Sequence, residues 1–336
     1  MGLGAAAAAS VALAGCGGSG ATTSAASSAA APAGGAPMGT NTPLQFVTGG
    51  ESGTYYAFGS VIAQHATNNA GVNLNAVAGN GSQANVQELQ DGISDLAFCQ
   101  SDVEAYAYEG TNLFAETGAV DCFSTVACLY DEQVQIVTCD ETIKTVEDLK
   151  GKNVSIGAAG SGVYFNAIDI LGAYGLSESD INPTYQSFAD SADALRDGKI
   201  DAAFVVAGVP TPAIVELANA KDIYLISLDQ EHVDKLKEIS PAYTEVTIPA
   251  GSYSSQKEEV LTVGMKATII ANTQVTEEQA YTIVKTIFEG KDDLAAAHAK
   301  GAELDLEYAS VCGIPYHPGA AKYFEEQGIT VETANP

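Results

Sequence analysis

Glycine-rich turns between predicted strands and helices are the parts of this chain best suited to bind a ligand. The first, Thr-Gly-Gly-Glu-Ser-Gly-Thr-Tyr-Tyr at residues 48–56, follows an apolar run at residues 44–47 and precedes a helical pattern at residues 55–70. Such a turn presents backbone N–H groups at the positive end of a helix dipole, where an anion binds. Similar joints occur at residues 79–82, 157–162 and 208–210. Four such joints, without a catalytic motif, predict a site that holds a small anionic ligand without transforming it.

Polar side chains at these joints could add hydrogen bonds to a ligand. Thr54 stands at the start of the first helical pattern, and Tyr55 or Tyr56 could close over a bound molecule. Ser82 is expected to cap a second helix, with Asn85 one turn further along. The spacing of these residues is explained equally well by structural roles as by ligand binding, because Ser and Asn often cap helices and a tyrosine can pack in the core.

Other chemistries lack the residue patterns that they need. The glycines of residues 157–162 resemble a dinucleotide fingerprint only weakly, because the acidic residue at the matching spacing, Asp180, lies in a predicted loop. The four histidines have no partner at metal-binding spacing, and the sequence contains no nucleophile elbow and no P-loop. Arg196, the only arginine, is predicted at a surface helix end, so we expect no arginine clamp. We expect no catalytic residue, no metal and no cofactor.

The first 43 residues are predicted to be an export signal and a tether. Residues 5–14 are small and mostly apolar, and they lead into Leu-Ala-Gly-Cys, which resembles a bacterial lipobox with Cys16 as the lipidated residue. The pattern lacks the usual Lys or Arg before the apolar run, and the alternative is an Ala/Gly-rich tail with a chance cysteine. Residues 17–43 are almost entirely Gly, Ser, Ala, Thr and Pro, which predicts a flexible tether.

The charge limits the partners of the folded part. Its net charge of −28 argues against nucleic acid, which needs a basic footprint, and against electrostatic docking on anionic lipid. The simplest explanation is solubility outside the cell. The chain beyond the tether is about 290 residues long, which suits two cores better than one.

Five cysteines besides Cys16 have spacings that match no zinc site. They are Cys99, Cys122, Cys128, Cys139 and Cys312. An export route permits disulfides, so a pairing of Cys122 or Cys128 with Cys139 is conceivable, but most are expected to be buried thiols.

Apolar runs and helical patterns alternate along the chain, which predicts an α/β protein with parallel or mixed sheets covered by helices. Ligands of such sheets bind beyond the carboxyl ends of the strands, where the glycine joints and Gln100 are predicted to lie. Two separate strands are predicted at residues 126–130 and 134–138, and two more near residues 244–248 and 260–270.

Six segments, in order, resemble the TAXI solute receptors of TRAP transporters. They are residues 48–56, 81–86, 96–102, 148–162, 198–210 and 314–328. The resemblance extends over residues 44–328 and implies a type II periplasmic-binding-protein fold, in which two α/β lobes flank a ligand cleft and are joined by two crossover strands.

The resemblance places the crossovers near residues 134–140 and 244–248. One lobe is then residues 44–138 plus 248–336, and the other is residues 139–247. Closure of the lobes buries the ligand. The receptor, a lipid-anchored extracytoplasmic monomer, then delivers it to a TRAP membrane permease driven by an ion gradient.

The ligands that the family implies are small carboxylates such as glutamate, glutamine or 2-oxoglutarate. Hydroxyl, amide and backbone N–H groups would bind the carboxylates, and a ring would pack on the aliphatic stem. The residues carried over are Thr54, Tyr55, Ser82, Asn85 and Gln100 from the first lobe, and Ser161, Gly162, Val163, Tyr164 and Gly208 from the second.

Glu51 departs from the family pattern, which usually has a small residue at that position. A carboxylate beside an anion site is costly unless it meets a cation. One hypothesis is that Glu51 contacts the ammonium group of an amino acid; the alternative is that it points to solvent.

Other functions remain to be weighed against a TRAP receptor. A tethered surface enzyme would need a nucleophile–base pair or a metal, and neither is found. A sensing module and a receptor of an ABC importer of the sulfonate or nitrate type could share the fold. The Gly-Thr-Tyr-Tyr and Pro-Tyr-His-Pro-Gly segments favour the TAXI family over the ABC receptor.

Overall fold

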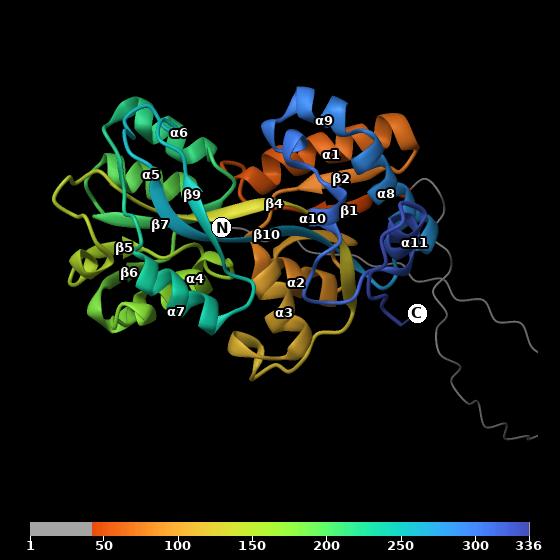
Figure 1. Cartoon of the computed structure of the whole chain (residues 1–336), viewed down its shortest axis with the longest axis horizontal. Coiled ribbons are helices and arrows are strands. Elements are labelled where there is room, and N and C mark those ends of the chain that lie inside the picture. The colour runs from red at the N-terminus through yellow and green to blue at the C-terminus, as the bar shows by residue number, and fades with distance from the viewer. Residues whose placement is uncertain (1–41, 336) are drawn as a thin grey trace, which may run out of the picture. The chain divides into compact units, whose positions relative to one another are not determined.

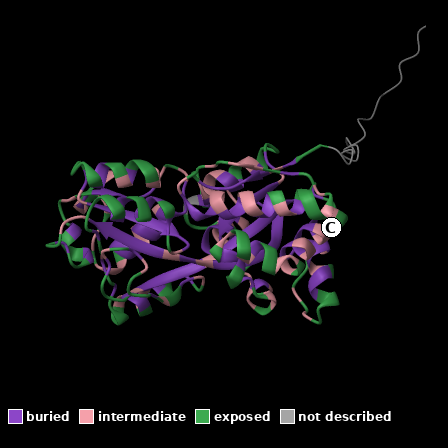
Figure 2. Ribbon diagram, turned by 90° about the horizontal axis from the view of Figure 1, so that it is seen from above, coloured by how far each residue is buried: buried purple, intermediate pink, exposed green. Residues whose placement is uncertain are grey.

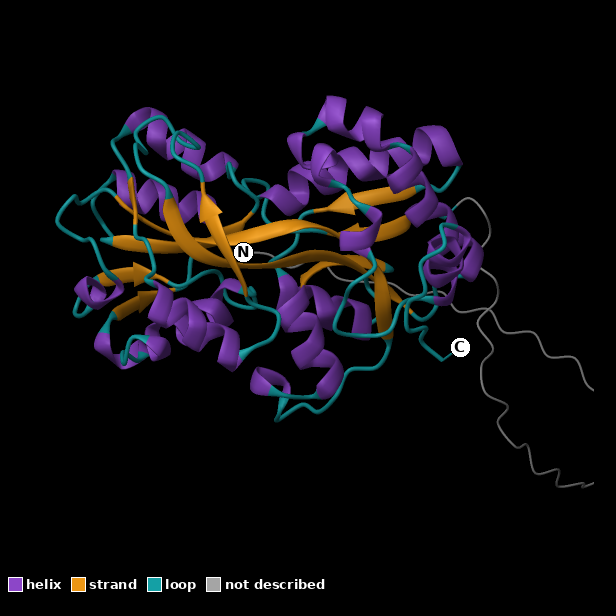
Figure 3. Cartoon of the chain, viewed as in Figure 1, coloured by secondary structure: helices purple, strands orange, loops and turns teal. Residues whose placement is uncertain are grey.

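A mixed β-sheet of ten strands runs through residues 42–335, the part of the chain that the computed structural model describes (Figure 1). Helices cover the sheet on both faces, as Figure 3 shows in purple and orange. The predicted export signal, Cys16 and all but the last two residues of the predicted tether lie outside the described residues.

In the first lobe, three parallel strands are followed by an antiparallel one. The spatial order is β2-β1-β3-β10, and β10 runs antiparallel to β3. These strands are β1 (Leu44–Val47), β2 (Leu74–Val77), β3 (Leu96–Gln100) and β10 (Val260–Asn272).

The second lobe repeats this arrangement. Its order is β6-β5-β7-β4, again with three parallel strands and an antiparallel fourth. These strands are β5 (Asn153–Ser155), β6 (Asn182–Thr184), β7 (Ala202–Ala207) and β4 (Phe123–Thr138), with β8 (Tyr224–Leu225) and β9 (Thr244–Ile248) at the sides of β4 and β10. The fourth strand of each lobe is therefore a long strand shared with the other lobe.

The shared strands differ from the sequence prediction in two ways. The two strands predicted at residues 126–130 and 134–138 are one continuous strand, β4, because its polar middle stays paired with β10.

The second crossing lies in β10 rather than at residues 244–248. The strand predicted there, β9, pairs only with the first five residues of β10 and stays beside the second lobe. Val263 and Met265 belong to the core of the second lobe, whereas Ala267 and Ile269 belong to that of the first, so the chain crosses near residue 266.

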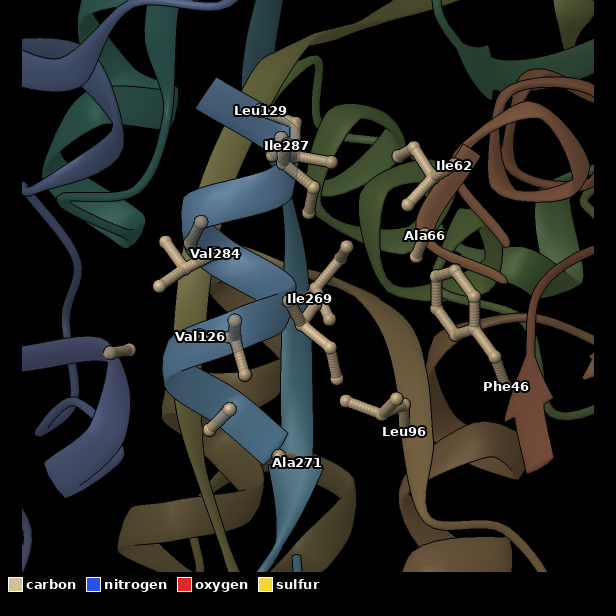
Figure 4. Packing of buried hydrophobic residues seen from close by; sticks show 14 of the residues in the cluster. Phe46, Ile62, Ala66, Leu96, Val126, Leu129, Ile269, Ala271, Val284 and Ile287 are labelled. Atoms are coloured by element: carbon tan, nitrogen blue, oxygen red, sulfur yellow. The ribbon is translucent and has the colours of Figure 1, made fainter. Parts of the chain in front are cut away.

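Side-chain alternation along the strands divides the first lobe into two cores, because successive residues point to opposite faces of a sheet. Phe46, Phe98 and Ile269 face one set of helices, whereas Val47 and Ile270 face the other. Figure 4 shows the first of these cores, with Ile62, Val284 and Ile287 packed over the sheet. Burial of each such side chain contributes about 1.5–3 kcal/mol.

The helices of the first lobe follow these two faces. Over the first core lie α1 (Thr54–Ala70), α8 (Glu277–Glu289), α9 (Lys291–Ala297) and α11 (Pro318–Glu326). Over the second lie α2 (Ser82–Gln90) and α3 (Ser101–Glu109). Short helices connect some of these elements: η1 (Asn112–Phe114), η4 (Ala299–Glu303) and α10 (Leu306–Ala309).

The second lobe is covered in the same way. On one face lie α4 (Val163–Ala173) and α7 (Gln230–Ile239), and on the other α5 (Phe188–Arg196) and α6 (Pro212–Ala220). Two short helices, η2 (Val146–Leu149) and η3 (Glu178–Asp180), begin with capping boxes. The sequence analysis missed α7, although its signal is present. Asp229 caps it, and Val233 and Leu236 form a buried stripe.

Burial is concentrated in the strands, while the outer surfaces of the helices are exposed (Figure 2). Within residues 42–335, no helix has the length and apolar character that crossing a bilayer requires. The five cysteines in this range are free thiols, so the pairing considered for Cys139 is not formed.

Candidate functional site

A cavity of about 110 Å³ lies between the two lobes. Residues that follow the carboxyl ends of β1, β2 and β5 line it, together with the last residues of β3 and β7. This is the position predicted from the glycine joints, and it is where α/β sheets bind their ligands. A cavity of this size suits a small metabolite.

Four helices begin at this cavity: α1, α2, α4 and α5. The first N–H groups of a helix have no partner within the helix. At α5, the Ser187 side chain accepts a hydrogen bond from the Asp190 backbone N–H at 3.1 Å. No side chain caps α1, α2 or α4. Three uncapped N-termini therefore direct backbone donors and positive dipole ends at one small space, which favours an anion.

The Ser161 hydroxyl points independently to a ligand. Its side chain lines the cavity, the residue is only 6% exposed, and Oγ has no hydrogen-bond partner in the described structure. A buried hydroxyl without a partner costs free energy, whereas a ligand oxygen at the adjacent N-terminus of α4 would satisfy it.

Seven of the ten residues carried over from the family resemblance line the cavity. They are Thr54, Tyr55, Ser82, Gln100, Ser161, Gly162 and Val163. The Thr54, Ser82 and Tyr55 hydroxyls already have protein partners. The Thr54 hydroxyl donates to the Gly208 carbonyl oxygen at 3.1 Å, and Ser82 Oγ accepts from the Gln100 backbone N–H at 3.1 Å. Ser82 is the first residue of α2 rather than its cap, since the cap position is Gly81.

The other three of these residues lie outside the lining. The Asn85 amide donates to the Thr48 and Phe98 carbonyl oxygens at 2.6 and 2.8 Å, so it joins the loop to β3. The Tyr164 hydroxyl donates to Glu178 at 2.9 Å, away from the cavity. Gly208 contributes its carbonyl oxygen to Thr54, which is a contact between the lobes.

Tyr55 does not close over the cavity as expected. It is buried in the first lobe, where its ring stacks on Phe98 at 4.5 Å between ring centroids and 8° between planes. Its hydroxyl donates to Glu132 Oε2 at 2.5 Å. Tyr55 therefore holds a second side chain in place at the cavity.

That side chain, Glu132, was missed by the sequence analysis. It lies in β4 where the strand passes between the lobes, it lines the cavity, and it is 2% exposed. The pKa of Glu132 is raised to about 8, mainly by burial and also by Asp102, against the lowering effects of the Tyr55 hydrogen bond and Lys300. A signal was present in the sequence, because Asp-Glu-Gln interrupts an otherwise apolar run.

Glu51, by contrast, is exposed and does not line the cavity. The hypothesis that Glu51 contacts a ligand ammonium group is therefore wrong. The cavity does have a carboxylate, but it comes from a different strand.

Basic side chains do not line the described cavity. Lys300 lies nearby, but its Nζ is 2.6 Å from Glu303 Oε1 and 5.3 Å from the centroid of the Tyr130 ring. Arg196 lies at the far end of α5, paired with Asp193 at 2.7 Å. Arginine is thus absent from the described lining, and the expectation that the ligand is bound without an arginine clamp stays a prediction. Among residues 42–335, no cluster of His, Cys, Asp and Glu could hold a metal ion.

The start of α5 is a further part of the lining that the sequence analysis missed. Gln186, Ser187 and Phe188 contribute from the second lobe. The Ser187 cap that begins this helix could have been recognised from the sequence, because Ser often caps helices.

The lobes are in contact around the cavity, so the structure is a closed form. The Ala84 backbone N–H donates to the Gly160 carbonyl oxygen at 2.9 Å across the lobes, and the Gln100 amide donates to Asn166 Oδ1 at 2.7 Å. Gly81, with φ 102°, lies against Ser161, and a Cβ there would be 3.2 Å from the Ser161 Cα. Only glycine adopts this backbone readily and permits so close an approach.

A family model for the NMT1-like family matches residues 46–328. The chain belongs to the NMT1-like family. This match covers both lobes and all of the cavity lining.

Solved structures resemble the chain at low identity. One is a protein of Bordetella bronchiseptica RB50, which is 18% identical with a TM-score of 0.52 over 85% of this chain and 89% of that one. The alkanesulfonate-binding protein SsuA from Xanthomonas axonopodis pv. citri, bound to MOPS, is 16% identical with a TM-score of 0.47 over 85% and 90%. A substrate-binding protein of an amino acid ABC transporter is 14% identical with a TM-score of 0.46 over 76% and 97%.

The predicted type II periplasmic-binding-protein fold is confirmed. Each lobe has three parallel strands and an antiparallel strand that arrives from the other lobe, which gives two lobes joined by two long strands.

Proposed function

We propose that this member of the NMT1-like family is an extracytoplasmic solute-binding receptor that captures a small carboxylate and delivers it to a membrane permease. The observation that carries this proposal is the cavity between the lobes. Three uncapped helix N-termini and the unpartnered Ser161 hydroxyl converge on it from both lobes. A ligand held there makes contacts in both lobes and so favours the closed form.

A carboxylate suits these donors because its two oxygens accept several hydrogen bonds at once. A sulfonate would use the same donors, and a sugar would leave the helix dipoles without an anion. The cavity lacks a nucleophile–base pair, so we propose that the ligand is bound and released unchanged.

Thermal unfolding of the full chain in the presence of amino acids, dicarboxylates, sulfonates and sugars tests the ligand class. A ligand at a hundredfold excess over its Kd stabilises the fold by about 2.7 kcal/mol. For a chain of this size, we therefore expect a rise in Tm of roughly 5–10 °C. A rise with sulfonates or sugars and none with carboxylates would contradict the carboxylate proposal but leave the receptor in place.

Two classes of permease are candidates for the partner. The TAXI-like segments imply a TRAP permease driven by an ion gradient, whereas ABC importers use receptors of this same fold. Uptake by cells that carry the receptor and its neighbouring transporter genes distinguishes the two. Loss of uptake when the ion gradient is collapsed at constant ATP supports the TRAP permease, and loss when ATP is depleted at a constant gradient supports the ABC importer.

We also propose that Cys16 anchors the receptor in the membrane through a lipid. Metabolic labelling with a fatty acid checks this, with Cys16→Ser as the control. Label that persists in Cys16→Ser would place the lipid elsewhere.

A further inference from the structure

We propose that the ligand is an amino acid, whose ammonium group binds the Glu132 carboxylate while its own carboxylate binds the helix N-termini. This inference rests on the proposed receptor function and specifies its ligand class. It follows from the pairing of charges at the cavity, in four steps.

The first step concerns the ionisable side chain in the cavity lining. Glu132 is the one side chain with a carboxyl or basic group among the described residues that line the cavity, and a cation beside it favours its ionised form. A carboxylate removed from water is costly unless it meets a cation or several donors. The Tyr55 hydroxyl is the only described group that donates a hydrogen bond to Glu132. A carboxylate can accept about four hydrogen bonds, so most of its capacity is free for a ligand.

The second step concerns the nearest protein cation. Lys300 lies close enough to lower the pKa of Glu132, but its ammonium group is 2.6 Å from the carboxylate of Glu303. The Lys300 side chain is 5% exposed, so it is fixed in that pair rather than free to turn to the cavity. The protein therefore leaves Glu132 without a cation of its own.

The third step concerns the rest of the lining, which favours an anion rather than a cation. The N-termini of α1, α2 and α4 and the Ser161 hydroxyl favour an anion. One small cavity thus offers donors for an anion and an acceptor for a cation. An amino acid carries both groups on one carbon, whereas a 2-oxo acid would set its carbonyl oxygen against the Glu132 carboxylate.

The fourth step concerns rigidity. Glu132 lies in β4 and is paired with Met265 of β10, in the middle of the sheet. Its side chain is held by Tyr55, whose ring is stacked on Phe98. An acceptor fixed in this way binds an ammonium group with little loss of side-chain conformational entropy.

The test compares matched pairs of ligands on the full chain by calorimetry. Each pair is an amino acid and the 2-oxo acid with the same side chain: glutamate with 2-oxoglutarate, alanine with pyruvate, and leucine with 4-methyl-2-oxopentanoate. For the pair with the best-fitting side chain, we expect the amino acid to bind at least about tenfold more tightly. Glu132→Gln should reduce affinity for the amino acid at least about tenfold and leave the 2-oxo acid unchanged or tighter.

The matched control is Glu51→Gln, which removes an exposed carboxylate from the loop between β1 and α1, outside the lining. It should retain the preference of the unaltered protein. Unfolding of the ligand-free Glu132→Gln protein checks that the substitution leaves the fold intact. If that variant did not fold, the comparison of the two ligands on the unaltered protein would still decide.

Equal affinity for both members of every pair, or a preference for the 2-oxo acid, would overturn the inference while the carboxylate receptor stands. A preference for the amino acid that persists in Glu132→Gln would also overturn it. Binding of sulfonates or sugars alone would overturn both the inference and the proposed carboxylate class.

Discussion

The Asn166 side-chain amide, in α4 of the second lobe, donates a 2.8 Å hydrogen bond to the Asp102 carboxylate in α3 of the first lobe. Asn166 Oδ1 also accepts from Gln100 at 2.7 Å, and its amide nitrogen lies 2.9 Å from the Tyr243 hydroxyl. All four side chains are buried. The closed form is therefore held by a polar cluster beside the cavity, in addition to whatever the ligand contributes.

Phe165, the residue before Asn166, strengthens this contact. Its ring is 2% exposed and stacks on Tyr106 and Phe114 of the first lobe, with centroids 5.9 and 6.4 Å apart. The core of the first lobe thus includes one side chain from the second.

Asn166→Leu should weaken ligand binding. In the closed form it removes the hydrogen bond to Asp102 and the one from Gln100 without replacing either, which costs about 1–3 kcal/mol for each buried group, whereas in an open form water solvates both. We expect the affinity to fall about 10- to 100-fold, measured by calorimetry. The exposed Asn182 bonds only within the second lobe, so Asn182→Leu is the control. Equal affinities for the two variants would show that this cluster does not contribute to closure.

Gly162→Ala should prevent full closure. Gly162 has φ −68°, which any residue adopts, but a Cβ would lie 1.8 Å from Gln100 Oε1 across the lobes. We expect at least a tenfold loss of affinity, since either the buried Gln100 side chain must give up its hydrogen bond to Asn166 or the lobes must separate to relieve the overlap. Gly172→Ala is the control, because a Cβ at Gly172 in the same helix meets nothing within 4 Å. If both variants bound the ligand equally, the close approach of Gly162 to Gln100 would not be needed for binding.

Stability of the ligand-free closed protein should fall as pH rises. Mainly because of burial, the pKa of Asp102 is raised to about 6, with the Asn166 hydrogen bond opposing the rise and Asp169 adding to it, and the pKa of Glu132 is raised to about 8. Both groups bind protons more tightly when folded. Their contribution to stability is therefore complete at pH values below the ordinary pKa of a carboxyl group. It is lost as pH rises through about 6 and then about 8.

We expect the Tm to decrease between pH 5 and pH 9 in a thermal titration. In Glu132→Gln the decrease above pH 6 should be much smaller, because the amide does not ionise. The groups that face Glu132 are Tyr55, Asp102 and Lys300, and the substitution leaves all three in place. Parallel pH profiles of the two proteins would contradict the raised pKa of Glu132.

Arg196→Gln should leave ligand affinity unchanged. Its guanidinium lies at the end of α5, 2.7 Å from Asp193 and 3.5 Å from Asp197, and its side chain is 43% exposed. Such surface pairs contribute about 0–1 kcal/mol. Calorimetry should give an affinity within a factor of two of the unaltered protein. A tenfold loss would show that Arg196 reaches the ligand after all.

The sequence by itself determined the local elements and the joints between them. The helix predicted at residues 55–70 is Thr54–Ala70 in the structure. The glycine joints that follow β1, β2 and β5 line the cavity as expected. These features depend on periodicity and turn residues within a few positions of each other, so they can be inferred without the tertiary fold.

Only the tertiary structure decided which polar residues face the cavity. Tyr55 and Glu132 are separated by 77 positions, and Gln100 and Asn166 by 66, so no local pattern pairs them. The same holds for the second crossing, which depends on β9 pairing with the start of β10 rather than on any feature of β9 itself. A side chain in a glycine joint faces either a neighbouring strand, like Asn85, or the cavity, like Ser161. The packing of the two lobes, rather than the residue type, makes that choice.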